Sequence, residues 1–201
     1  MIQLVKNALY RFGVHSYLAK SRFKKINELY SERLTTGKRL RILEVGCHNG
    51  RDFVSFLELE RALEIKGIDL VDHGIQQENF EYCRADAENI PFDDDYFDLV
   101  VSIGVLEHIS PIEKLCSMIS EIERVGKSHI IVVPSISTLV EPHTAKLVWQ
   151  WRQANSKPSY SDNLNFFSDE AWLSFKGFET SKIKRSWFIP LLISNTYIYD
   201  V

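Results

Sequence analysis

The sequence predicts an α/β fold in which helices cover both faces of a parallel sheet. Short apolar runs of strand length alternate with stretches of helical period, as in successive β-α-β units. The run "LRILEVG" (40–46) is apolar at most positions, as expected of a strand buried on both faces. A glycine turn follows this strand, at the edge where such sheets bind ligands.

The overall composition is that of an ordinary globular domain. The 201 residues are 45% hydrophobic and 25% charged, and the net charge of −3 gives no general reason to expect nucleic acid as a partner. The three cysteines form neither a CxxC pair nor a zinc spacing, so no metal site is predicted. With no apolar signal region and no run of membrane-spanning length, we expect a cytoplasmic protein.

The N-terminal residues 1–36 are predicted to form a helical segment ahead of the main domain at 37–201. Between Met1 and Asn27 the chain has six basic residues and no acidic ones, interleaved with apolar residues at helical spacing. Such a segment either covers a ligand as a lid or rests on an anionic membrane surface. The core-like spacing of its apolar residues favours the lid.

The remaining elements follow in order from the same patterns. Further strands are predicted at 64–70, 81–86, from 97 onward, 127–135, 178–188 and 195–201. Helices are predicted at 51–63, 111–125 with Gly126 as its stop, and 168–177 with Ser168 as its N-cap. The stretch 71–80 is predicted to be a loop or a single turn, and 87–96 is a predicted loop. The aromatic-containing segment 136–166 either builds an acceptor pocket or covers the edge of the sheet.

The turn "GCHNG" (46–50) argues against a dinucleotide ligand. A dinucleotide turn needs G-x-G-x-x-G, whereas the spacing here is G-x-x-x-G and Glu44 precedes it. A carboxylate there would repel a pyrophosphate but would accept hydrogen bonds from a positively charged amino group. Asp69 follows Gly46 by 23 residues, about the interval at which an acid meets ribose hydroxyls. The pattern favours a cationic, phosphate-free ligand that carries ribose.

The motifs "ILEVGCHNG", "GIDL" and "RADAENIPFDDDYFDLVVSIGVLEHI" together resemble those of class I S-adenosylmethionine-dependent methyltransferases of the small-molecule, methyltransferase type 11-like kind. The likeness runs through residues 38–135 in order and at the family's spacing. It implies a Rossmann-like, doubly wound, seven-stranded mixed sheet whose last strand is antiparallel. It also implies S-adenosylmethionine as cofactor and methyl transfer to a small-molecule or glycan-like acceptor, with oxygen as the expected acceptor atom.

The resemblance implies a role for each residue of the glycine turn. Glu44, Gly46 and Gly50 would surround the methionine moiety of the cofactor. Cys47 and His48 would contribute backbone groups. His48 stands where many members of the family have a glycine, so its side chain is expected either to crowd the cofactor or to point into the acceptor pocket.

Four further residues would hold the nucleoside. Asp69 would accept hydrogen bonds from both ribose hydroxyls, and Leu70 would form a wall of the adenine pocket. Asp86 would accept from the adenine amino group while Ala87 offers its backbone N–H.

Two histidines are candidate catalytic residues on the acceptor side. Ile103 and Gly104, ending the fourth strand, would lie near the methyl group, and "LEHI" places His108 just beyond them. "VEPHT" places His143 beyond the fifth strand. A histidine accepts a hydroxyl proton readily near neutral pH. The alternative for His143 is that Pro142 makes a turn in which the histidine only satisfies backbone groups.

Two other functions are compatible with parts of this pattern. A NAD-dependent oxidoreductase is disfavoured by Glu44 and by the missing central glycine. A non-catalytic module of the same fold, binding a partner or a membrane, stays open because of His48 and the short link after Asp69.

Overall fold

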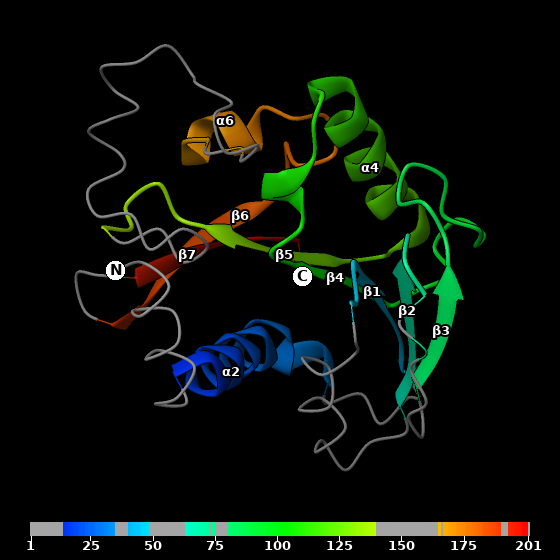
Figure 1. Cartoon of the computed structure of the whole chain (residues 1–201), viewed down its shortest axis with the longest axis horizontal. Helices are drawn as coiled ribbons and strands as arrows, with labels where there is room; N and C mark the ends of the chain where they lie inside the picture. Colours follow the sequence, from blue (N-terminus) through cyan, green and yellow to red (C-terminus); the bar gives the residue numbers. More distant parts are fainter. Residues whose placement is uncertain are drawn as a thin grey trace.

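The computed structural model describes residues 14–34, 40–48, 63–72, 74, 80–139, 165, 167–189 and 193–200, which contain a seven-stranded sheet ordered β3-β2-β1-β4-β5-β7-β6 (Figure 1). Its strands are β1 (Leu40–Val45), β2 (Leu63–Asp69), β3 (Phe80–Arg84), β4 (Leu99–Ile103), β5 (His129–Pro134), β6 (Lys182–Ile189) and β7 (Ile193–Asp200). Strands β1 to β5 pair in parallel, and β7 is antiparallel to both of its neighbours. The predicted seven-stranded mixed sheet with an antiparallel last strand is confirmed.

Helices cover the two faces of the sheet, as predicted. Helix α2 (Val14–Leu34) lies on one face, and α4 (Ile112–Val125) and α6 (Asp169–Leu173) lie on the other (Figure 1). Strand β5 shows how one strand serves both layers. Its Ile130 belongs to the core beneath α2 and its neighbour Ile131 to the core beneath α4, because successive side chains point to opposite faces.

Helix α2 is a structural cover of the sheet. Phe23, Ile26 and Tyr30 are buried at helical spacing and pack in one cluster with Ile42 of β1. The Tyr30 hydroxyl donates a hydrogen bond to the backbone carbonyl of Asp98 at 3.2 Å. Residues 1–13 of the predicted lid lie outside the described residues. No helix of the described part of the chain is both long and apolar enough to cross a bilayer.

Gly126 ends α4 as predicted, but its backbone is extended, with φ −115°. A Cβ at this position would lie 2.4 Å from Cγ2 of Val100, so glycine allows the chain to pass close to β4. The predicted fourth strand begins at Leu99 rather than at 97. Phe97 forms only an isolated parallel bridge with Gly126.

Helix α6 is shorter than the predicted 168–177. Ser168 is its N-cap, as expected, since the side chain accepts from the N–H of Ala171 at 3.2 Å. Beyond Leu173 the chain forms i→i+3 hydrogen bonds, and in one of them the N–H of the fully buried Phe178 donates to the carbonyl of Phe175. The predicted helix ends early because this turn carries the next aromatic side chain into the core.

The other predicted boundaries are close to those observed. Strands β2, β3, β5, β6 and β7 differ from the predicted 64–70, 81–86, 127–135, 178–188 and 195–201 by one to four residues at their ends. Asp86 therefore lies in the loop after β3 rather than at its last position. The predicted helix 51–63 lies outside the described residues apart from Leu63, which begins β2.

Candidate functional site

A cavity of about 350 Å³ lies at the carboxyl ends of the central parallel strands. It sits between β1 and β4, where the chain switches from building the sheet in one direction to building it in the other. Its volume is within the usual range of small-molecule sites. It is lined by every predicted cofactor residue that the structure describes, namely Glu44, Gly46, Cys47, His48, Asp69, Leu70, Asp86, Ala87, Ile103 and Gly104. Gly50 lies outside the described residues.

Gly46 is required by both conformation and space. Its φ is +76°, and a Cβ there would lie 2.4 Å from Cγ2 of Val105 in the chain after β4. Its N–H and that of Cys47 both donate to the Ile68 carbonyl, at 2.9 and 3.1 Å. The turn is thus fixed to β2 on one side and passes closely over the end of β4 on the other.

Cys47 is a buried packing residue of this turn. Its side chain is 4% exposed, and a Cβ on Gly67 would come within 2.8 Å of its Sγ, so Gly67 makes room for it. Burial and the neighbouring carboxylates of Glu44 and Asp69 raise the pKa of the thiol to about 12. The thiol stays protonated at neutral pH, so only the backbone of Cys47 is suited to a ligand role.

His48 occupies the left-handed region, with φ +46°. Glycine adopts this conformation without cost, whereas other residues are strained in it. The imidazole is exposed at the rim, and the His48 N–H donates to Oδ2 of Asp69 at 2.9 Å. The Val71 N–H donates to Oδ1 of the same carboxylate at 3.1 Å. Each oxygen retains a second lone pair that can accept a hydrogen bond from a ligand.

Strand β3 holds the segment after β2 in place. The Tyr82 hydroxyl donates to the Val71 carbonyl at 2.8 Å and lies 3.1 Å from that of Asp69. Arg84 Nε donates to the carbonyl of Leu70 at 3.1 Å, and the Leu70 side chain, 55% exposed, is left on the cavity wall. The sequence analysis missed Tyr82 and Arg84, although their i, i+2 spacing places both on one face of the strand.

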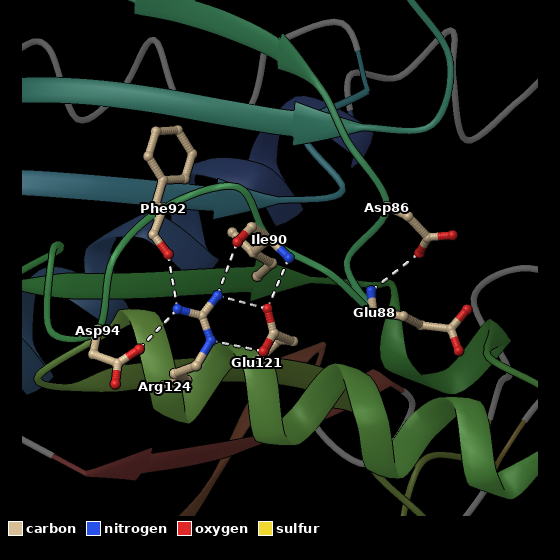
Figure 2. Close-up of polar contacts among 7 residues, drawn as sticks. All are labelled: Asp86, Glu88, Ile90, Phe92, Asp94, Glu121 and Arg124. Carbon is tan, nitrogen blue, oxygen red and sulfur yellow. Dashed lines mark hydrogen bonds and ion pairs between the residues drawn. The ribbon is translucent and has the colours of Figure 1, made fainter.

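The loop after β3 carries Asp86 and Ala87 and is held to α4 by Arg124 (Figure 2). The guanidinium donates to the carbonyls of Ile90 and Phe92, each at 2.8 Å, and to Asp94 at 2.9 Å. These bonds fix both backbone and side chain of the loop from one residue of the helix. Close to the cavity, the Glu88 N–H donates to Oδ1 of Asp86 at 3.0 Å.

Glu121 lies one helical turn from Arg124, and the two side chains together form a clamp that holds the loop to α4. The Glu121 carboxylate accepts two bonds of 2.7 Å from Arg124 and one of 2.8 Å from the Ile90 N–H (Figure 2). Such a fork-to-fork pair has a fixed geometry. The i, i+3 spacing of the two charges was the only sequence signal for it, and that spacing is common on exposed helices.

The electrostatics of the cavity suit a cation better than a phosphate. Glu44 is 3% exposed, and Asp69 and Asp86 add two further carboxylates to the wall. The one lysine among the described lining residues, Lys114, is paired with Glu88 at 2.6 Å and lies 3.9 Å from Asp86. These hydrogen-bond acceptors fit a ligand with an ammonium group and ribose hydroxyls, and their negative charge opposes a pyrophosphate.

A short 3₁₀ helix, η1 (Leu106–His108), follows β4 and carries one of the two predicted catalytic residues, His108. His108 is exposed and lines the main cavity, whereas Glu107 is fully buried. The Asn165 side chain donates to the Ile109 carbonyl at 2.5 Å and the Leu106 carbonyl at 3.3 Å, which fixes η1. The other predicted catalytic residue, His143, lies outside the described residues.

This strand order, with a glycine turn after β1 and acids at or just beyond the ends of β1, β2 and β3, defines the fold of class I S-adenosylmethionine-dependent methyltransferases. Residues 43–133 match the family described as "Methyltransferase domain". The matched residues, a little under half of the chain, are similar to the methyltransferase domains of that class, whose cofactor is S-adenosylmethionine.

Known relatives differ in what they act on. The chain is 37% identical over 75 residues to a phthiotriol/phenolphthiotriol dimycocerosates methyltransferase of Mycobacterium leprae, covering 34% of this chain and 27% of that protein. It is 29% identical over 119 residues to a tRNA (carboxymethyluridine(34)-5-O)-methyltransferase of Arabidopsis thaliana, covering 58% of this chain and 28% of that protein. The chain therefore spans little more than a quarter of either relative.

A solved structure shows the same fold over nearly the whole chain. It is a Burkholderia thailandensis 1,6-didemethyltoxoflavin-N1-methyltransferase with its substrate and S-adenosylhomocysteine bound. The TM-score is 0.59 at 14% identity, over 99% of this chain and 89% of that one. At this identity the likeness concerns the fold alone.

Proposed function

We propose that this chain transfers a methyl group from S-adenosylmethionine to a small-molecule or glycan-like acceptor, with oxygen as the acceptor atom. The single observation that carries the proposal is the cavity at the strand-order switch, whose wall brings together Glu44, Asp69 and Asp86. These acids come from three separate strands or the loops after them. Their charge suits a cofactor that is cationic and lacks phosphate.

The proposed division of labour follows the position of each residue. The buried carboxylate of Glu44 would accept from the ammonium group of the methionine moiety, and Asp69 from the ribose hydroxyls. Leu70 would cover the adenine ring, with Asp86 and Ala87 at its polar edge. When bound, S-adenosylmethionine supplies a methyl group already activated on a sulfonium. The protein's task is therefore to orient the acceptor and exclude water, which is worth roughly 7–11 kcal/mol in favourable cases.

The acceptor class rests on weaker but independent grounds. The net charge of −3 gives no electrostatic reason for a nucleic-acid acceptor. Fold and cofactor do not decide the acceptor, since the relatives are named for phthiotriol/phenolphthiotriol dimycocerosates, a tRNA and 1,6-didemethyltoxoflavin. His108 lines the cavity and remains a candidate proton acceptor, as does His143 on sequence grounds.

The proposal is tested by calorimetric titration with S-adenosylhomocysteine, with NAD titrated in parallel. We expect micromolar binding of S-adenosylhomocysteine and none of NAD. Binding of NAD alone would favour an oxidoreductase. Heat from neither ligand would favour a non-catalytic module of this fold.

A further inference from the structure

A second, smaller cavity adjoins the cofactor cavity on the side of α2. Its volume is about 30 Å³, and it lies at the carboxyl end of β5 between α2, η1 and β7. Ile103 and Gly104 line both cavities, so the two spaces meet at the end of β4. Under the proposed function this is where the methyl group would face the acceptor.

One wall of the small cavity is a buried carboxylate. Glu107 is fully buried, and its Oε1 lies 3.6 Å from the point where a Cβ on Gly104 would stand. Gly104 has φ +71°, a conformation that favours glycine, and because glycine has no side chain the junction is left clear. The carboxylate thus lies beside Gly104, where the two cavities adjoin, and is sheltered from bulk water.

The opposite wall carries hydrogen-bond donors. With the Asn195 amide oriented so that its oxygen faces Arg22, Nε of Arg22 donates to it at 3.1 Å and the amide nitrogen donates to the Ser194 carbonyl at 3.1 Å. Asn195 is 4% exposed, so this bond holds the guanidinium at the cavity from a buried anchor. A donor from α2 and an acceptor from η1 therefore line the same small space.

The size and polarity of this space select one kind of group. The cavity of about 30 Å³ is large enough for a group the size of a water molecule, which needs roughly 10–15 Å³ of such space. A hydroxyl or primary amine fits it, and a phosphate or a second ring does not.

We infer that the Arg22–Glu107–Asn195 cavity receives the hydroxyl group that is methylated and that Glu107 accepts its proton. The inference rests on the proposed function. As the acceptor oxygen forms its bond to the methyl carbon, its proton passes to Oε of Glu107. The electron pair of the broken carbon–sulfur bond stays on sulfur, so the sulfonium and carboxylate charges both vanish. Glu107 suits this role better than the exposed His108, since it alone borders both the small cavity and Gly104.

The test compares two cofactor analogues and needs no knowledge of the acceptor. Sinefungin has an amine-bearing carbon where S-adenosylmethionine has its methyl-sulfonium. S-adenosylhomocysteine has a neutral sulfur there, with neither a methyl group nor a charge. A buried carboxylate facing that point would favour the sinefungin ammonium. We expect Glu107→Gln to reduce the preference for sinefungin over S-adenosylhomocysteine by about tenfold, with the Kd of S-adenosylhomocysteine unchanged.

Controls separate the role of the charge from folding. Glu113→Gln makes the same change on the exposed surface of α4 and should leave the preference intact. Glu107→Asp keeps the charge but moves it away from the cofactor cavity, because the side chain is one methylene shorter. It should give an intermediate preference even if Glu107→Gln folds poorly. Melting temperatures are measured for all three variants. An unchanged preference in both Glu107 variants, with S-adenosylhomocysteine still bound, would overturn the inference and leave the proposed function standing. Absence of S-adenosylhomocysteine binding in the unaltered protein would instead overturn the proposed function, and the inference with it.

Discussion

The two sides of the cofactor cavity are held in place by different means. On the β1–β2 side, the Asp69 carboxylate fixes the backbone of His48 and Val71, and the same carboxylate is the proposed ribose ligand. On the β3–α4 side, Arg124 and Glu121 fix the loop, and neither is among the residues lining the cavity. The Asp69 carboxylate thus serves both support and the proposed ligand binding, whereas Arg124 and Glu121 serve support alone. Substitution of Arg124 or Glu121 should therefore separate stability from affinity, and substitution of Asp69 should not.

The largest effect on affinity is expected from Asp69→Ala. It removes the proposed ribose contacts and also the acceptor for two backbone N–H groups, and each hydrogen bond to a charged group is worth about 1.5–3 kcal/mol. The Kd of S-adenosylhomocysteine, measured by calorimetry, should rise about 100-fold or more. Asp72→Ala is the matched control, because the Asp72 carboxylate accepts from the Gly74 N–H outside the cavity lining. A change of less than threefold at Asp69 would argue against its ribose role.

The largest effect on stability is expected from Arg124→Met. The change leaves two loop carbonyls without their donor and leaves the Glu121 carboxylate with the Ile90 N–H in place of three donors. The free energy of unfolding, from urea titration, should fall by about 2–4 kcal/mol, with only a few-fold loss of S-adenosylhomocysteine affinity.

Arg185→Met is the control for the loss of an arginine. It breaks a single ion pair with Asp169 in which the arginine is 43% exposed, and should cost less than about 1 kcal/mol. Equal destabilisation by the two variants would show that the clamp contributes no more than a surface pair.

The clamp also predicts a pH dependence. The hydrogen bond from Arg124 lowers the pKa of Glu121 below its ordinary 4.5, against the opposing effect of burial and with further help from the Ile90 N–H. Because the folded-state pKa is the lower one, this stabilisation is complete above pH 4.5 and is lost as the pH falls through the folded-state value. Glu121→Gln should cost about 1 kcal/mol at pH 7 and progressively less below pH 4.5 in urea titrations. A cost that stays constant with pH would contradict the assignment.

The smallest effect is expected from His48→Gly, on the first side. His48→Gly removes a left-handed backbone strain of roughly 1 kcal/mol but raises the conformational entropy of the unfolded chain, which costs a similar free energy. The melting temperature should therefore change little. His48→Val places a β-branched residue at φ +46° and should destabilise by about 1–2 kcal/mol. A large loss of stability or of S-adenosylhomocysteine affinity in His48→Gly would instead assign the imidazole itself a role.

The sequence predicted the first side of the cavity better than the second. Gly46 and Asp69 are recognisable because a tight turn and a strand-end acid have local signatures. Tyr82, Arg84 and Arg124 gave no such signature, since their partners are backbone carbonyls 11 to 34 residues away. The sequence predicted Gly126 as a helix stop but not its close approach to Val100, because that approach depends on how the chain returns from α4 to the sheet.

The order of strands and helices, the two buried faces and the acids around the cofactor cavity were determined by the sequence itself. Apolar periodicity and turn residues act over a few positions, and a parallel sheet then brings its strand ends to one edge. Only the tertiary structure decided which side chains hold the loops there, and that Glu107, Arg22 and Asn195 enclose a common space. Those three residues come from a helix, a 3₁₀ turn and the last strand, so their proximity depends on packing between distant segments, which local sequence patterns do not encode.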